Sequence, residues 1–295
     1  MGKQEHVTWA ASVIIPCYNC AEVIGLQLEA LAGQQIDQPW EVVLADNGSS
    51  DDLAAAIEPF QSRFDCLRIV AAGDEKGSAY ARNVGAKAAR SELLLFADAD
   101  DEVGEGWLAA MLEALRVHDF VGCRMDFEKL NPSEDGRARR SLQQQGLQPY
   151  TYPSFLPHAA GGTLGVRRSV HEEVGGFDTS LLRLQDTDYC WRIQLAGHEM
   201  HFVPDAVVHY RLRESLGETW RQAFRYGEYN VKLYSLYKGK GMGKLTLVRM
   251  LRGWYSLLRQ LPQLLDEERR GKVVWNMAWR IGRIYGSFRY RVLAF

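Results

Sequence analysis

Apolar and polar positions alternate in blocks along the first third of the chain. Four short runs are almost entirely apolar: 12–16, 41–45, 67–71 and 93–97. The segments that follow them have helical spacing, and they are 20–31, 51–60, 78–90 and 106–117. Apolar strands separated by helices are typical of a parallel sheet that helices cover on both faces. Such sheets bind ligands beyond the carboxyl ends of their strands, so the candidate site is sought there.

The rest of the chain has weaker strand signals and a long helical end. Short apolar runs return at 165–166 and 200–203, whereas residues 216–295 have helical spacing and little strand character. We therefore predict an α/β domain over residues 1–215 and a helical extension over 216–295.

A polar, Gln-rich segment interrupts the pattern over residues 131–153. Its prolines and its composition predict a long surface loop. Three arginines lie in it: Arg137, Arg139 and Arg140. They either face water or contact an anionic substrate, and the sequence leaves both interpretations open.

Composition places the chain among ordinary globular proteins. Of its 295 residues, 46% are hydrophobic and 24% are charged, which excludes a disordered or collagen-like chain. No stretch of about 18 apolar residues predicts a membrane-spanning helix, and the first residues lack a signal-peptide core. Five cysteines without a dense framework favour a reducing cytoplasm.

The net charge of −2 hides a strong asymmetry. Residues 238–295 hold 13 Lys and Arg against 3 Asp and Glu, whereas residues 1–237 hold 22 against 34. A basic tail with several aromatic residues could lie on the inner face of an anionic membrane or bind a phosphorylated lipid. Alternatively, its cations face water, pair with the acidic part of the chain or lie in a homodimer interface. We expect no nucleic-acid binding, because the acidic body would repel phosphate chains.

The most specific candidate chemistry ends the fourth apolar run, at Asp98, Asp100 and Asp101. Positions i and i+2 of an extended chain point to the same side, so Asp98 and Asp100 can converge on one cation. Carboxylate oxygens suit Mg²⁺ or Mn²⁺, which also bind phosphate oxygens. The alternative is a cluster that caps the next helix, and it applies most readily to Asp101.

Two more segments follow strand ends. Asp46 lies in a turn-rich segment and can accept a hydrogen bond from a base or a ribose, or can simply cap a turn. Its position, comparable to that of Asp98, favours a ligand role. Arg82 lies among small residues that let a helix approach the sheet. It can hold a phosphate, orient the carboxylates or form a structural ion pair.

A further signal combines the glycine turn Gly175-Gly176-Phe177-Asp178 with a helix that begins near Gln185 and ends at Gly197. Asp186 and Asp188 stand in its first turn. The helix dipole stabilises a carboxylate anion there, and such an anion can act as a general base. The alternative is that either residue only caps the helix.

Taken in order, these segments resemble the family-2 inverting glycosyltransferases of the GT-A fold. The resemblance covers roughly residues 10–215, and it rests on the ordered set of motifs: Pro16-Cys17-Tyr18-Asn19, Asp46-Asn47-Gly48-Ser49, 77–85, Asp98-Ala99-Asp100-Asp101, Gly175-Gly176-Phe177-Asp178 and Asp186-Thr187-Asp188. It implies a Rossmann-like, mainly parallel sheet with a nucleotide-sugar half over about 1–101 and an acceptor half over about 102–215.

The resemblance also implies an activity and a set of roles. A hexosyl group would pass, with inversion, from a nucleotide-diphosphate sugar, by default a UDP-sugar, to a glycan or lipid-linked acceptor of the cell envelope, with Mn²⁺ or Mg²⁺ as cofactor. Asp186 would be the base. Asp98 and Asp100 (the DxD motif) would bind the metal, joined by His209. Eight residues would bind the nucleotide-sugar donor, and Asp98 is one of them as well as a metal ligand. They are Pro16, Tyr18, Asp46, Arg82, Asp98, Gly161, Gly162 and Thr163.

The chain departs from the family pattern at two positions. Gln185 stands where a Glu usually precedes the base, and Asn47 replaces a common second Asp. The lost carboxylate leaves open a catalytically impaired sugar-nucleotide-binding protein. A nucleotidyltransferase is a second alternative, but residues 16–21 lack its Gly-rich loop and basic residues. Cys17 and Cys20 have the spacing of a redox or metal pair, but without a second pair a zinc site is not expected.

Overall fold

In the computed structural model, residues 8–131, 143–212, 215–267 and 269–294 are described. The chain divides into two compact units. The first unit contains Met1–Asp126, Leu142–Gln148 and His158–Arg211, and the second contains Phe127–Ser141, Pro149–Pro157 and Leu212–Phe295. The second unit therefore includes two short segments from the middle of the chain as well as its helical end.

The first unit is built on one eight-stranded sheet with the order β3-β2-β1-β4-β7-β6-β8-β5. Its strands are β1 (Ser12–Cys17), β2 (Glu41–Asp46), β3 (Cys66–Ala71), β4 (Leu93–Phe96), β5 (Glu102–Val103), β6 (Phe120–Asp126), β7 (Leu164–Arg167) and β8 (Met200–His209). Strands β1 to β4 pair in parallel, as do β6 and β8, whereas β7 and β5 run antiparallel to their neighbours. The α/β class and the mainly parallel sheet are confirmed.

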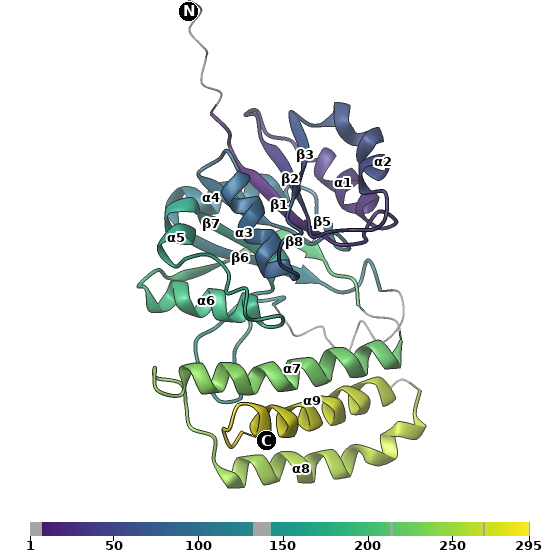
Figure 1. Cartoon of the computed structure of the whole chain (residues 1–295), viewed down its shortest axis with the longest axis vertical. Coiled ribbons are helices and arrows are strands. Elements are labelled where there is room, and N and C mark those ends of the chain that lie inside the picture. The colour runs from purple at the N-terminus through teal and green to yellow at the C-terminus, as the bar shows by residue number, and fades with distance from the viewer. Residues whose placement is uncertain (1–7, 132–142, 213–214, 268, 295) are drawn as a thin grey trace, which may run out of the picture. The chain divides into compact units, whose positions relative to one another are not determined.

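Helices surround this sheet, as Figure 1 shows. They are α1 (Ile24–Ala32), α2 (Leu53–Ile57), α3 (Ser78–Ala88), α4 (Trp107–Val117), α5 (Arg168–Glu173) and α6 (Gln185–Leu195), with 3₁₀ turns η1 (Glu58–Arg63) and η3 (Gly161–Thr163). The helix predicted over 51–60 ends earlier, at Ile57, and continues as η1. Pro59 lies in the first turn of η1, where its missing N–H costs no internal hydrogen bond.

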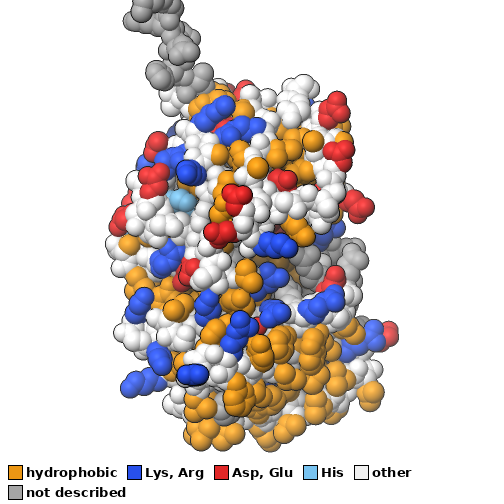
Figure 2. Space-filling view, viewed as in Figure 1, with side chains coloured by type: hydrophobic (Ala, Val, Ile, Leu, Met, Phe, Trp, Pro, Cys, Tyr) orange, Lys and Arg blue, Asp and Glu red, His pale blue; other side chains and the backbone are white. Residues whose placement is uncertain are grey.

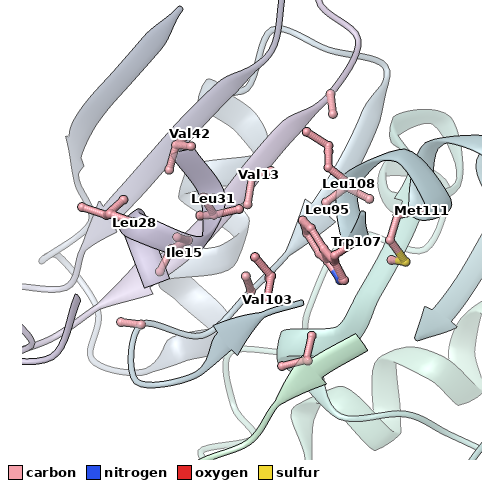
Figure 3. Packing of buried hydrophobic residues seen from close by; sticks show 14 of the residues in the cluster. Val13, Ile15, Leu28, Leu31, Val42, Leu95, Val103, Trp107, Leu108 and Met111 are labelled. Atoms are coloured by element: carbon pink, nitrogen blue, oxygen red, sulfur yellow. The ribbon is translucent and has the colours of Figure 1, made fainter. Parts of the chain in front are cut away.

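The main core lies between the sheet and helices α1 and α4. Figure 3 shows that Val13, Ile15 and Val42 of the strands pack with Leu28 and Leu31 of α1. The same buried cluster extends to Trp107 of α4. Strand β2 is buried over its first five residues, which explains its uninterrupted apolar sequence. This rigid layer fixes the strand ends from which the site loops extend.

The second unit is a helical layer formed by α7 (Leu216–Tyr237), α8 (Leu247–Gln260), η4 (Leu261–Leu265) and α9 (Arg270–Arg289). Figure 1 shows α9 between α7 and α8. A Cβ on Gly282 would overlap the Phe224 carbonyl oxygen, and one on Gly227 would overlap that of Trp279, so glycine permits the close approach of α7 and α9. Among the described residues, no helix is long and apolar enough to cross a membrane.

The segment predicted as a surface loop over 131–153 is only partly one. Its arginines, Arg137, Arg139 and Arg140, lie outside the described residues. Gln143, in contrast, is buried in the first unit, and its side-chain amide donates to the carbonyl of Cys123 at 2.7 Å. It also donates to the hydroxyl of Thr163 at 2.7 Å. A polar side chain is buried here because its hydrogen bonds are satisfied.

Candidate active site

The ends of β1 and β2 carry two loops that hold each other. The Asn19 amide N–H donates to Ser49 Oγ at 3.0 Å, and Asn19 Oδ1 accepts from the Ser50 amide at 2.7 Å. Asp46, the last residue of β2, accepts from the Ser49 amide through Oδ1 at 2.9 Å. Tyr18 lies in the same loop with 61% of its surface exposed, so its ring is free to stack on a ligand.

Asn47 connects this region to the start of α3. Its amide group donates to the carbonyls of Ala72 and Glu75, at 2.5 and 2.7 Å, and its Oδ1 accepts from the Gly77 amide at 2.8 Å. An aspartate could not make the two donor contacts. Asn47, which replaces the common second Asp, therefore has a structural role: it holds the segment that leads into α3.

Arg82 of α3 and Asp98 after β4 form the buried centre of the site. Arg82 Nη2 donates to Asp98 Oδ1 at 2.5 Å, while only 4% of the Arg82 side chain and 29% of the Asp98 side chain are exposed. The Arg82 guanidinium lies 5.6 Å from the centre of the Phe177 ring. Its Nε and Nη1 are buried without a hydrogen-bond partner among the described residues. Both nitrogens therefore remain available as donors to a ligand.

Gly161 and Gly162 of η3 bring this pair next to Asp186. A Cβ on Gly161 would lie 2.9 Å from Arg82 Nη2, and one on Gly162 would lie 2.8 Å from Asp98 Oδ2. The Gly161 amide N–H also donates to Asp186 Oδ2 at 3.1 Å. The absence of side chains at the two glycines thus lets Arg82, Asp98 and Asp186, from three separate elements, meet around one short turn.

Asp186 is held by backbone donors in the first turn of α6. Its Oδ2 accepts from Gly161, and its Oδ1 accepts from the Thr187 amide at 2.8 Å. Each oxygen therefore has one fixed donor and retains lone pairs for an incoming proton. Gln185 points elsewhere: its amide donates to Ser78 Oγ at 3.0 Å and so ties α6 to α3.

Asp188 has a structural role, which distinguishes it from Asp186. It is buried, and its Oδ2 accepts from Arg192 Nε at 2.7 Å. Arg192 in turn donates to the carbonyls of Val174 and Gly176, at 2.6 and 2.7 Å. Together they fix the glycine turn that precedes α6.

Asp100 and Asp101 are joined to the end of β8 through Arg211. The Arg211 amide donates to Asp101 Oδ1 at 3.0 Å, and Arg211 Nε donates to the Asp100 carbonyl at 3.0 Å. Asp101 is buried, so its carboxylate supports the loop, whereas Asp100 is half-buried. The contacts of Asp101 therefore favour a structural role over metal binding.

His209 ends β8 beside a carboxylate. Its Nδ1 lies 2.7 Å from Asp126 Oδ2, which favours the proton on Nδ1 and leaves Nε2 as an acceptor. Metal-binding histidines commonly have such a carboxylate partner. Among the described residues, however, no three His, Cys, Asp or Glu side chains form a closed metal site. An open set of carboxylates fits Mg²⁺ or Mn²⁺ when substrate phosphates complete the coordination.

The structure shows two neighbours of the site that the sequence did not indicate. His158 is half-buried, and desolvation lowers its pKa to about 4 although the negative charge of Asp186 acts in the opposite direction. Gln143 contacts Thr163, whose hydroxyl also donates to the Ala160 carbonyl at 2.7 Å. The Thr163 hydroxyl thus supports the turn. Neither neighbour lies in a motif, so only the tertiary fold could reveal them.

The chain is similar in sequence to known glycosyltransferases. Residues 12–175 match the family described as Glycosyl transferase family 2. Glycosyltransferase AglE of Haloferax volcanii is 30% identical over 228 residues, which are 76% of this chain and 74% of AglE. Pre-mycofactocin glycosyltransferase of Mycobacterium tuberculosis is 28% identical over 230 residues, which are 72% of this chain and 45% of the mycobacterial protein.

Solved structures share the fold at low sequence identity. Mannosyltransferase PcManGT from Pyrobaculum calidifontis, in complex with GDP-Man and Mn²⁺, has a TM-score of 0.67 and 17% identity, covering 96% of this chain and 88% of its own. TarS 1–349 of S. aureus, in complex with UDP-GlcNAc, has a TM-score of 0.53 and 17% identity, covering 96% and 92%.

The strand order and the shared architecture show that the chain has the GT-A fold. The family match and the relative in Haloferax volcanii identify it further: the chain belongs to glycosyl transferase family 2.

Proposed function

We propose that this chain is a metal-dependent inverting glycosyltransferase. It moves a hexosyl group from a nucleoside-diphosphate sugar, with UDP as the first candidate nucleotide, to a hydroxyl of a glycan or lipid-linked acceptor. The observation that carries the proposal is the meeting of the Arg82–Asp98 pair and Asp186 at Gly161. A cation-binding carboxylate, an anion-binding guanidinium and a general base are the groups that such a transfer requires.

Asp186 acts on the acceptor. Backbone N–H groups of Gly161 and Thr187 fix its two oxygens, so the carboxylate is already oriented when an acceptor hydroxyl arrives. The carboxylate takes the hydroxyl proton as the oxygen attacks the anomeric carbon, and the bond to the diphosphate breaks on the opposite face. A single displacement of this kind inverts the configuration at that carbon.

Arg82 and the nucleoside loops hold the donor. Arg82 Nε and Nη1 are directed as donors to the diphosphate, while Asp98 fixes the guanidinium through Nη2. The exposed Tyr18 ring, next to Pro16, stacks on the base, and Asp46 accepts from the nucleoside. Gly161 and Gly162 border the sugar, because any side chain there would fill the space next to Arg82 and Asp98.

A divalent ion is part of the proposal. Asp98 and Asp100 would hold Mn²⁺ or Mg²⁺, with His209 as a further neighbour. When bound, the ion supplies positive charge to the departing diphosphate. The oxygen ligands of Asp98 and Asp100, two residues apart after β4, support this assignment, and the Mn²⁺ in the PcManGT complex is consistent with it.

The cellular setting is also a proposal. All five cysteines are free thiols, which suits the reducing cytoplasm. An acceptor of the cell envelope is often attached to lipid, and the basic C-terminal region would then contact the inner face of the membrane. A homodimer remains a prediction of the sequence.

Thermal unfolding with a panel of nucleotide sugars tests the donor assignment. A specific donor should raise Tm by mass action, and more strongly with Mn²⁺ than without it. Asp100→Ala should abolish the Mn²⁺-dependent part of the shift, whereas the exposed control Asp37→Ala should retain it. An unchanged Mn²⁺-dependent shift in Asp100→Ala would contradict the metal assignment.

Product analysis separates the three candidate reactions. Release of nucleoside diphosphate supports glycosyl transfer, and release of pyrophosphate supports a nucleotidyltransferase. Donor binding without any turnover, over a panel of acceptor hydroxyls, supports a sugar-nucleotide-binding protein in which Gln185 has replaced the supporting carboxylate. The N–H donors that surround Asp186 favour the first outcome.

A further inference from the structure

The outer face of α8 and η4 is apolar although it is exposed. Exposed residues on it are Leu247, Val248, Leu251, Tyr255, Leu258, Leu261, Leu264 and Leu265. At 100° per residue, the five of these positions that lie in α8 cover an arc of about 100° along one side of the helix, and the three leucines of η4 follow at its end. Leu251, Leu258 and Leu265 are 55%, 61% and 93% exposed, so the arc is a continuous surface rather than scattered residues.

A different face of α8 is packed inside the second unit. Met250 and Leu257 are buried, and Arg280 of α9 lies against Trp254. A Cβ on Gly253 would also overlap the Arg280 guanidinium. Packing inside the unit therefore explains why Met250 and Leu257 are apolar. It does not explain why the exposed residues of the outer arc are apolar.

Positive side chains border the outer arc. Arg252 and Arg259 lie seven residues apart, on the same side of α8 and next to the apolar arc, and both are exposed. Lys238, Lys240 and Lys244 are exposed in the loop that leads into α8. Figure 2 shows this arrangement within the second unit: hydrophobic side chains gather over its helices, with Lys and Arg side chains at the edge of the patch.

We propose that the outer face of α8 and η4 docks on an anionic lipid surface. An apolar stripe flanked by cations is the pattern of a helix that lies in the plane of a membrane interface. The inference deepens the membrane contact of the proposed function, on which it rests, by naming the surface that makes it. The docked surface would hold the enzyme where lipid-linked acceptors are.

Charge decides between lipid and a second copy of the chain. Arg252 and Arg259 are exposed beside this face, so two copies that meet through it would bring like charges together. An anionic lipid surface, in contrast, gains about fivefold in affinity for each cation brought near it. The apolar arc and its cationic border therefore both fit an anionic lipid surface.

The tryptophans of the tail do not form this face. Trp275 packs against Tyr226, with ring centres 5.8 Å apart, and Trp279 packs against Tyr152 at 5.4 Å. Tyr285 and Phe288 are exposed, but both lie on α9. The leucines of α8, rather than these tryptophans, provide the apolar contact.

Vesicle flotation of the full-length protein tests the proposal. The protein should float with vesicles that contain 30% phosphatidylglycerol in phosphatidylcholine, and about tenfold less with pure phosphatidylcholine. Raising the salt from 0.1 to 1 M should reduce the flotation, because it screens the attraction between the cations and the lipid headgroups. Equal flotation with both vesicles, or none, would overturn the proposal.

Two double variants identify the surface. Leu251→Gln with Leu258→Gln should lower the affinity for anionic vesicles at least tenfold. Arg252→Gln with Arg259→Gln should lower it about 25-fold at low salt and less at 1 M, since each cation contributes about fivefold. The matched control, Val117→Gln with Leu195→Gln, replaces exposed apolar residues of the first unit and should float like the wild type.

Donor binding separates this inference from the proposed function. Both double variants should keep the wild-type Tm shift with the donor and Mn²⁺, since they change exposed residues of the second unit only. Normal donor binding without flotation rejects the docking surface alone, and flotation without donor binding rejects the transferase proposal alone. A dimer that Leu251→Gln with Leu258→Gln converts to monomer, in a protein that does not float, would assign the face to self-association.

Discussion

Glycines bring chain segments together in both units, but they make room for different groups. In η3, the missing side chains of Gly161 and Gly162 leave space for the charged groups of Arg82 and Asp98. Between α7 and α9, the missing side chain of Gly282 leaves space for a backbone carbonyl. A side chain can move when it is crowded, whereas a carbonyl inside a helix cannot. The first kind of glycine should therefore control function, and the second should control stability.

The surroundings of the two regions differ in the same way. The site keeps polar atoms available: Nε and Nη1 of Arg82 are buried without partners among the described residues, and Asp186 uses one donor per oxygen. In the second unit, the buried Glu228 accepts from Arg225 and Arg289, at 2.9 and 3.0 Å. Glu228 is thus held by two guanidinium groups, which stabilise the fold, whereas Asp186 is held by neutral N–H groups and keeps its capacity to act as a base.

The largest effect is expected at Asp186. Asp186→Asn should lower kcat by roughly 10²–10⁴, because a general base contributes about this factor, and should leave the donor-induced Tm shift intact. Single-turnover kinetics with a donor that shows a Tm shift would measure it. The control Glu172→Gln removes an exposed carboxylate from α5 and should retain full activity. If Asp186→Asn also keeps full turnover, the assignment of the base is wrong.

The next effect tests the helical contact. Gly282→Ala should lower the free energy of unfolding by about 3 kcal/mol, since the added methyl group would push α9 away from the Phe224 carbonyl. Gly217→Ala is the matched control in α7: nothing lies within 4 Å of its added Cβ, so it should be neutral or slightly stabilising. Urea unfolding followed by circular dichroism measures both, and equal stabilities would break the proposed distinction between the two kinds of glycine.

Acid should weaken the first unit, which contains all seven histidines of the chain. Burial lowers the pKa of His158 and of His171 to about 4 in the folded protein, below the unfolded value of about 6.5. The unfolded chain then binds more protons as the pH falls through this window. Stability is therefore complete above pH 6.5 and is lost progressively towards pH 4.

The loss should reach at most about 2 kcal/mol per histidine between pH 6.5 and pH 5. His171→Gln can retain a hydrogen bond to Tyr189 and removes one titrating group. Its urea-unfolding stability should therefore depend less on pH than that of the wild type. His198, whose pKa is raised by hydrogen bonds to Glu173 and Asp119, acts in the opposite sense and only weakly, because it is close to solvent. Parallel pH profiles of variant and wild type would contradict this account.

The smallest effect concerns the glycine next to Asp98. Gly162→Ala would place a methyl group 2.8 Å from Asp98 Oδ2, so the carboxylate has to turn away. Donor affinity with Mn²⁺ should fall about tenfold, which corresponds to about 1.4 kcal/mol, with little change in the urea midpoint. The control Gly146→Ala meets nothing within 4 Å. A large loss of stability in Gly162→Ala would place this glycine in the same class as Gly282.

The sequence predicted the sheet well where strands are buried on both faces. The apolar runs at 12–16, 41–45 and 93–97 correspond to β1, β2 and β4 within one residue at each end. It missed β6 (Phe120–Asp126), which contains a glycine and two charged residues, and it shortened β8 (Met200–His209), which is irregular after Val203. Both depart from the continuous apolar pattern on which the prediction relied.

The sequence by itself determined which residues could carry the chemistry: carboxylates at strand ends, a basic helical tail and an ordered set of motifs. Local spacing could not decide between Asp186 and Asp188, which share one helical turn, whereas the family resemblance named Asp186 as the base. The Asp188–Arg192 pair is local, four residues apart in α6, but only the tertiary structure places Asp186 at Gly161, 25 residues away in the chain. Local spacing fixes which face of an element a residue lies on. Contacts between distant segments depend on the strand order of the whole sheet and on the connections between its strands. No single motif contains that information.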